Sequence, residues 1–184
     1  MRDGGRYRSL IVLLVLAGAI ASAQAAGISL PWIAQKRATE CGRAVLASLA
    51  ARRGGDPEAF YTRLPAPPDP AHGYSVADMQ RFGAQVGIDL TLLAPRGLVI
   101  AGECSPRPPV TEHFKRLAKL VAAGQPVVVP VESGPASGHY LVLVAAENGR
   151  FTALDPATPA LRQIPATQLA PLMCPFGYVA LVSR

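Results

Sequence analysis

The sequence predicts an α+β domain in which an N-terminal helical half packs against a small C-terminal antiparallel sheet. Between residues 41 and 122, apolar residues recur mainly at helical spacing. From residue 126 onward, short runs of branched residues are separated by turn residues, a pattern typical of an antiparallel meander. The 184 residues suffice for one such domain. We expect chemistry in a cleft between the two halves.

The first 25 residues have the layout of a secretory signal peptide. A basic start, "MRDGGRYR", precedes the apolar run "SLIVLLVLAGAIA" and the small residues "ASAQAA", which offer cleavage after Ala23 or Ala25. The apolar run is shorter than the roughly 20 residues that a membrane-spanning helix needs. We therefore expect a signal peptide over 1–25, a single domain over 26–184 and a periplasmic or secreted location. An uncleaved N-terminal anchor is the alternative.

Four helices are predicted from apolar spacing and end signals. They run from Cys41 to a stop at Gly54-Gly55, from the cap Asp56 to about Leu64, from the Ser75–Asp78 capping box to Gly87, and from the cap Thr111 to Gly124. The proline-rich residues 65–73 and residues 95–110 are predicted to be connections.

Strands are predicted over 88–93, 126–132, 139–146, 150–155 and 177–184. A three-residue loop over residues 147–149 would pair Ala146 with Arg150. Asp155 would then lie opposite Leu141, on the same face as His139 and one diagonal step away. A slip of one residue would place Asp155 and His139 on opposite faces.

The cysteine count is odd, so at least one of the three thiols is not in an internal disulfide. Cys104 and Cys174 lie in proline-flanked segments and are the better candidates to pair, closing a loop of about 70 residues. Two unpaired cysteines are the alternative.

Cys41 lies where a loop becomes a helix, in "QKRATECGRAVLASL". A helix N-terminus lowers the pKa of a thiol. Its free backbone N–H groups, above all that of Cys41, can donate hydrogen bonds to an oxyanion. Gln35, six residues upstream, could supply a second oxyanion donor, and Gly42 would leave the approach to the sulfur open. A buried cysteine of the core is the alternative interpretation.

A nucleophilic thiol needs a base, and the chain has three histidines. His72 in the proline-rich connection and His113 in the first turn of a helix are expected at the surface. His139 begins a strand beside the Gly- and Ser-containing segment "ESGPASG", and Asp155 could orient its ring. A structural histidine and an ordinary Asp-Pro turn are the alternatives.

Other classes of site find little support in the sequence. The net charge is +6, but the basic residues are scattered, so we expect no nucleic-acid partner. No phosphate-binding glycine loop is present. A metal site combining Cys41, His139 and the other two cysteines lacks CxxC or HxxxH spacing, so no cofactor or metal is expected.

Three segments together resemble the bacteriocin-processing cysteine peptidases, the papain-like domains that remove double-glycine leader peptides. They are "QKRATECGRAVLASL", "GYSVADMQRFGAQVGIDL" and "GQPVVVPVESGPASGHYLVLVAAENGRFTALDPA", within a similarity from about Ile33 to Asp155. The resemblance implies a papain-like fold, with Cys41 as nucleophile, His139 as base, Asp155 as its orienting group and Gln35 in the oxyanion hole.

The expected function is therefore that of an exported cysteine peptidase acting on a protein or peptide, such as a leader-bearing or surface-assembly protein. An exporter or secretion machinery is the expected partner, and membrane contact is expected only through the signal. The best-known family members are cytoplasmic domains fused to ABC exporters, so double-glycine specificity is not carried over. The alternatives are a non-catalytic peptide-binding relative that assists secretion or assembly, and another thiol acyl-transfer enzyme, transglutaminase-like or amidase.

Overall fold

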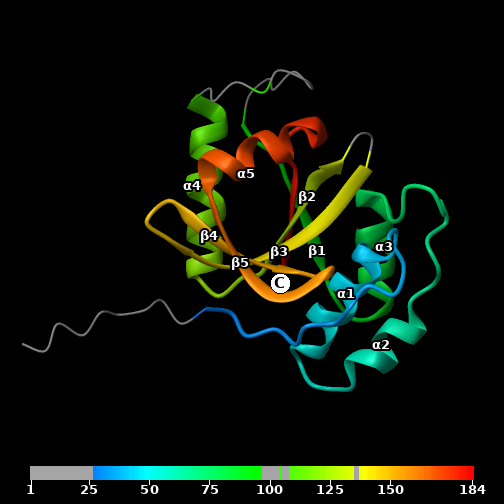
Figure 1. The fold of residues 1–184 in the computed structure, drawn as a ribbon. Coiled ribbons are helices and arrows are strands. Elements are labelled where there is room, and N and C mark those ends of the chain that lie inside the picture. Colours follow the sequence, from blue (N-terminus) through cyan, green and yellow to red (C-terminus); the bar gives the residue numbers. More distant parts are fainter. Residues whose placement is uncertain (1–26, 97–103, 105–107, 135–136) are drawn as a thin grey trace, which may run out of the picture.

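The computed structural model describes residues 27–96, 104, 108–134 and 137–184. The predicted signal peptide and most of the predicted connection over 95–110 lie outside these ranges. The elements, shown in Figure 1, are α1 (Cys41–Ala51), α2 (Pro57–Arg63), α3 (Val76–Gln85), β1 (Leu90–Leu93), α4 (Pro108–Ala122), β2 (Val127–Gly134), β3 (Ser137–Glu147), β4 (Arg150–Asp155), β5 (Thr158–Pro165), α5 (Ala166–Met173), the short 3₁₀ helix η1 (Cys174–Phe176) and β6 (Ala180–Ser183).

All strands form one antiparallel sheet in the order β1-β6-β2-β3-β4-β5. Strands β2 to β5 form the predicted meander, but the last strand does not extend it. Instead β6 returns to lie between β1 and β2. Strand β5 and helix α5 were not predicted from the sequence. Nearly every residue of β5 is exposed, so it lacks an alternating pattern, and α5 contains Pro171.

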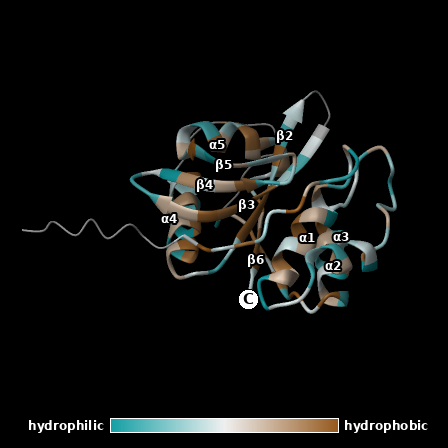
Figure 2. Cartoon of the chain, turned by 60° about the horizontal axis from the view of Figure 1, so that its bottom comes forward, coloured by the Kyte–Doolittle hydropathy of each residue, from teal (hydrophilic) through white to brown (hydrophobic). Residues whose placement is uncertain are grey.

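Helices cover both faces of the sheet, so the helical half predicted as one unit is divided (Figure 1). Val128 of β2 packs with α1 and α3 on one face, while its neighbours Val127 and Val129 pack with α4 and α5 on the other. Successive strand residues point to opposite faces, so the apolar run in β2 builds both cores. Figure 2 shows these hydrophobic strands between the two groups of helices. In the described part of the chain, no helix combines the length and apolarity needed to cross a membrane.

The predicted helix ends are mostly confirmed. Helix α1 begins at Cys41 and stops before Gly54, whose φ of 102° is left-handed. The Ser75–Asp78 capping box of α3 is present in both directions. The cap predicted at Thr111 is wrong, because α4 already begins at Pro108, where a proline has no N–H to leave unsatisfied.

The β3–β4 hairpin reaches the predicted register by a different route. Asn148 and Gly149 form a two-residue turn with φ values of 50° and 73°, so Glu147 pairs with Arg150 and the three-residue loop is wrong. A register shift between Leu143 and Ala145 then compensates for the missing residue. Beyond this shift Val142 pairs with Leu154, and the same register carried one step further sets Asp155 opposite Leu141, as predicted.

The disulfide between Cys104 and Cys174 is confirmed, with the two Cα atoms 5.4 Å apart and a sequence separation of 70. Cys174 is the first residue of η1, which is followed by β6. The cross-link therefore ties the start of this C-terminal segment to residue 104.

Candidate active site

A cavity of about 580 Å³ lies where the helices α1 and α3 meet the end of the sheet. Cys41 of α1 and His139 of β3 both line it. Tyr74 and Ser75 ahead of α3 form one wall, and Phe176 of η1 belongs to another. The structure thus brings the predicted nucleophile and the predicted base to one cavity between the helical layer and the sheet.

The thiol of Cys41 is free and buried, with 4% of the residue exposed. Burial raises its pKa and outweighs the backbone N–H groups of Tyr140, Gly42 and Cys41, which lower it. The expectation of a lowered pKa is therefore wrong, because desolvation of the thiolate exceeds the effect of the helix N-terminus. A thiol of this kind needs a nearby base to lose its proton.

His139 is held by Asp155. Its Nε2 lies 2.7 Å from Oδ1 of Asp155, which leaves Nδ1 as the ring nitrogen available to another group. The backbone N–H of Ala157 donates to the same Oδ1 at 2.9 Å. Burial alone would raise the pKa of Asp155, but the bonds from Ala157, His139 and Arg162 together lower it. The carboxylate therefore remains charged while it fixes the ring.

Two further partners of Asp155 were not predicted from the sequence. Nη1 of Arg162 lies 3.0 Å from Oδ2, and the indole N–H of Trp32 donates to the backbone oxygen of Asp155 at 2.9 Å. Arg162 belongs to β5, which has no sequence pattern to identify it as a strand. Trp32 is separated from Asp155 by 123 residues, so only the fold reveals this contact.

Gln35 lies close to the site by its backbone, while its side chain is turned to its own loop. Its backbone N–H donates to the oxygen of Pro156 at 3.0 Å, next to Asp155. The side-chain Nε2 donates to the oxygen of Ala38 at 3.4 Å, and Oε1 is buried without a hydrogen-bond partner. The role of Gln35 in an oxyanion hole stays a prediction.

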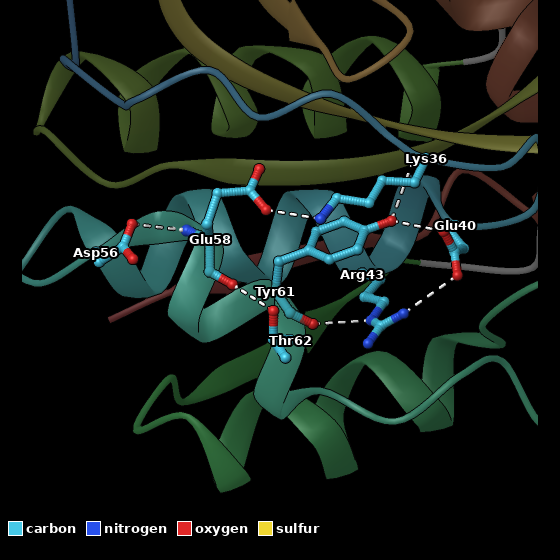
Figure 3. A network of polar contacts seen from close by, with 7 residues as sticks. All are labelled: Lys36, Glu40, Arg43, Asp56, Glu58, Tyr61 and Thr62. Carbon is cyan, nitrogen blue, oxygen red and sulfur yellow. Dashed lines mark hydrogen bonds and ion pairs between the residues drawn. The ribbon is translucent and has the colours of Figure 1, made fainter.

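A buried polar network supports the segment that leads to Cys41 (Figure 3). The hydroxyl of Tyr61 donates to Oε2 of Glu40 at 2.6 Å and accepts from the backbone N–H of Lys36 at 3.1 Å. Arg43 donates to Oε1 of Glu40 at 3.2 Å and to the backbone oxygen of Tyr61 at 2.9 Å. The network therefore joins the loop before α1 to both α1 and α2.

Gly42 has a packing role that differs from the one predicted. A Cβ at this position would lie 2.8 Å from the sulfur of Met79 and 3.0 Å from Cβ of Tyr74. The missing side chain therefore lets α1 approach α3 and the cavity wall closely, while an open approach to the sulfur stays a prediction.

The other two histidines differ from each other. His72 is exposed and pairs with Asp69 at 2.7 Å, as expected for a surface residue. His113 is 3% exposed, so its predicted surface position is wrong; it is buried in α4, with its ring edge-on to that of Phe114. Burial lowers its pKa to about 4, against a hydrogen bond to the backbone of Tyr178 that raises it. Within the described ranges, no group of three or more His, Cys, Asp or Glu side chains is placed to hold a metal ion.

No protein-family model and no curated protein matches the sequence, whereas solved structures match the fold. A C39-like peptidase from Bacillus anthracis aligns with a TM-score of 0.57 at 14% identity, covering 84% of this chain and 94% of that one. The peptidase domain of Streptococcus ComA, a bifunctional ABC transporter, aligns with a TM-score of 0.58 at 17% identity, covering 85% of this chain and 98% of that one. A double-glycine motif protease from an AMS/PCAT transporter, in complex with the leader peptide, aligns with a TM-score of 0.53 at 17% identity, covering 85% of this chain and 93% of that one. Five α-helices around one six-stranded antiparallel sheet, in the described residues, therefore give this chain the papain-like fold of the C39-like peptidase domains.

Proposed function

We propose that this chain is an exported cysteine peptidase. The observation that carries the proposal is that Cys41 and His139 line one cavity while Asp155 holds Nε2 of His139 at 2.7 Å. A thiol, an imidazole and an orienting carboxylate in this relation are the parts that nucleophilic acyl transfer requires. The C39-like fold, seen in peptidases, supports the same reading.

In the proposed mechanism, Nδ1 of His139 takes the proton of Cys41 and the sulfur attacks a peptide carbonyl carbon. The carbonyl oxygen becomes an oxyanion, which accepts hydrogen bonds from the backbone N–H of Cys41 and from Gln35. Gln35 reaches it by releasing its 3.4 Å bond to Ala38. The C–N bond then breaks, and His139 returns the proton to the leaving amine. Water, deprotonated by His139, hydrolyses the thioester and restores the thiol.

The raised pKa of Cys41 gives His139 a defined part in this sequence. Because burial disfavours the free thiolate, loss of the thiol proton depends on His139 as its acceptor. Asp155 stabilises the imidazolium that forms, and its lowered pKa keeps it charged for this purpose.

We propose that the substrate is an exported peptide or protein, such as a leader-bearing or surface-assembly protein. The signal-like residues 1–25 support export to the periplasm or beyond, with an exporter or secretion machinery as the partner. One similar structure holds a leader peptide, which supports a peptide as the ligand of this chain.

Alkylation by iodoacetamide tests the chemistry without a known substrate. The folded wild-type protein should be modified at Cys41, located by peptide mass spectrometry, and His139→Ala should slow this reaction by an order of magnitude or more. Arg150→Met on β4 serves as the control and should leave the rate unchanged, because the exposed side chain of Arg150 lies away from this cavity, whereas His72 belongs to its lining. Equal rates for wild type and His139→Ala would refute the proposed base.

Comparison of the exported proteins of cells carrying wild-type protein or Cys41→Ala tests the activity itself. A protein terminus that appears only with wild type identifies the cleaved bond and the substrate. Identical sets of termini would contradict peptidase activity under those conditions.

A non-catalytic peptide-binding role is the second candidate, and two observations favour it. The thiol is buried with a raised pKa, and the side chain of Gln35 is bonded to Ala38 instead of lining the cavity. A binder would retain its peptide partner after Cys41→Ala and would show no dependence of Cys41 alkylation on His139. A peptidase would accumulate uncleaved substrate with the same variant.

A further inference from the structure

The carboxylate of Asp155 is shared between two elements of the sheet. Its Oδ1 accepts from His139 of β3 and from the backbone of Ala157, while its Oδ2 lies 3.0 Å from Nη1 of Arg162 on β5. Arg162 pairs directly with Ala153, and the register then shifts before Asp155. This places the guanidinium diagonally beside the carboxylate, within reach of a long side chain.

Burial gives the Arg162 contact its importance. The side chain of Asp155 is 4% exposed, so water can replace few of its hydrogen bonds, whereas the side chain of Arg162 is 53% exposed. Without the guanidinium, Oδ2 would be a charged oxygen with no partner in a buried position, which is costly. The carboxylate could relieve this only by rotating or by taking a proton, and either change weakens its bond to Nε2 of His139.

Arg162 also lies next to His139 in space. Both side chains line a second cavity, of about 760 Å³, on the β5 side of the base. Glu132 is the other charged residue of this lining. The charged and titratable groups that contact the carboxylate of Asp155 in the described residues are His139 from β3 and Arg162 from β5, and the charge of Asp155 adds to the burial that raises the pKa of Cys41 on α1.

We propose that Arg162 is a positioning residue of the active site: it clamps Oδ2 of Asp155 so that Oδ1 faces the ring of His139. It acts through the carboxylate and touches no reacting atom. This inference rests on the proposed function and adds a fourth member, supplied by the edge strand β5, to the group formed by Cys41, His139 and Asp155. The guanidinium is always charged and places an N–H donor on Oδ2 from a long side chain, so one charge-assisted hydrogen bond holds this oxygen.

The experiment measures the rate of Cys41 alkylation by iodoacetamide in four variants. Arg162→Met removes the charge and the donor and should lower the rate about tenfold. Arg162→Lys keeps the charge and should recover most of the loss, and Arg162→Gln, which keeps a neutral donor, should fall between them. The control is Arg150→Met on the neighbouring strand β4, where the arginine is exposed and away from both cavities; its rate should equal that of wild type.

A spectroscopic readout separates positioning from general destabilisation. The Nε2–H proton of His139, donated to a carboxylate, should give a far-downfield proton NMR signal that disappears in Asp155→Asn. In Arg162→Met this signal should weaken or shift, and in Arg162→Lys it should return. A purely structural role for Arg162 would lower the melting temperature but leave the signal and the alkylation rate in place.

The outcomes distinguish the two proposals. Wild-type rate and an unchanged signal in Arg162→Met, with a slow His139→Ala variant, would overturn the role of Arg162 and leave the peptidase proposal standing. A rate that His139→Ala does not change either would refute the proposed function itself. If Arg162→Met does not fold, as judged by circular dichroism, the ordering of wild type, Arg162→Lys and Arg162→Gln decides the question.

Discussion

Removal of the Cys104–Cys174 disulfide should destabilise the fold by constraining the unfolded chain less. The bond closes a loop with 70 residues of sequence separation, and the chain-entropy estimate for such a loop is about 4 kcal/mol. For a domain of this size, each kcal/mol corresponds to about 2–4 °C, so the melting temperature should fall by about 10 °C. The loss should also loosen the cavity, because Phe176 of its wall follows Cys174 in η1.

Urea unfolding measures this cost. The background is Cys41→Ala, so that the free thiol cannot exchange with the disulfide. Oxidised protein in this background is compared with the same protein after reduction, in which both cysteine side chains remain. A second comparison uses the double variant Cys104→Ala, Cys174→Ala, in which both sulfur atoms are absent. Reduction should lower the free energy of unfolding by about 4 kcal/mol and raise the urea m-value, since the open unfolded chain exposes more surface. A loss below about 1 kcal/mol would refute the reasoning.

Three further changes test other parts of the structure. Gly73→Ala would place a Cβ 2.5 Å from the backbone oxygen of Thr39, at a φ of 81°. Gly87 has a similar φ of 78° but open space around it, so Gly73→Ala should destabilise the fold by about 2 kcal/mol more than Gly87→Ala. Equal losses of stability in urea unfolding would contradict this. Tyr61→Phe removes the 2.6 Å hydrogen bond to the buried Glu40 and should lower the free energy of unfolding by about 2 kcal/mol. A double-mutant cycle with Glu40→Gln should show strong coupling, and additive losses of stability would show that the bond contributes little. Burial lowers the pKa of His113 to about 4 from its ordinary 6.5, so as pH falls between these values the unfolded chain binds the proton first and wild-type stability declines. His113→Asn should flatten that decline in thermal melts across the same pH range, and an unchanged slope would contradict the assignment.

The site could be predicted from sequence where its parts depend on nearby residues. The start of α1 at Cys41 follows from the apolar spacing that comes after it and from the glycines that end it. The meeting of His139 and Asp155 follows from a hairpin in which they are 16 residues apart, and it holds although the turn and the register shift each differ from expectation by one residue. Local rules of strand pairing suffice at such separations because the turn itself brings the partners together.

Burial and long-range contacts could be decided only by the tertiary structure. The desolvation that raises the pKa of Cys41, and the burial of His113, depend on what distant segments cover those side chains. The bond between Arg162 and Asp155 requires β5, an edge strand whose exposed residues carry no periodic signal.

By itself, then, the sequence determined the α+β class, the helix start that carries the thiol and the residues of the β3–β4 hairpin, because periodicity, caps and turns act between neighbours in the chain. The tertiary structure decided which face each helix covers, how far the thiol is withdrawn from water and which arginine completes the carboxylate. These depend on solvent exclusion by the whole fold, which no local pattern encodes.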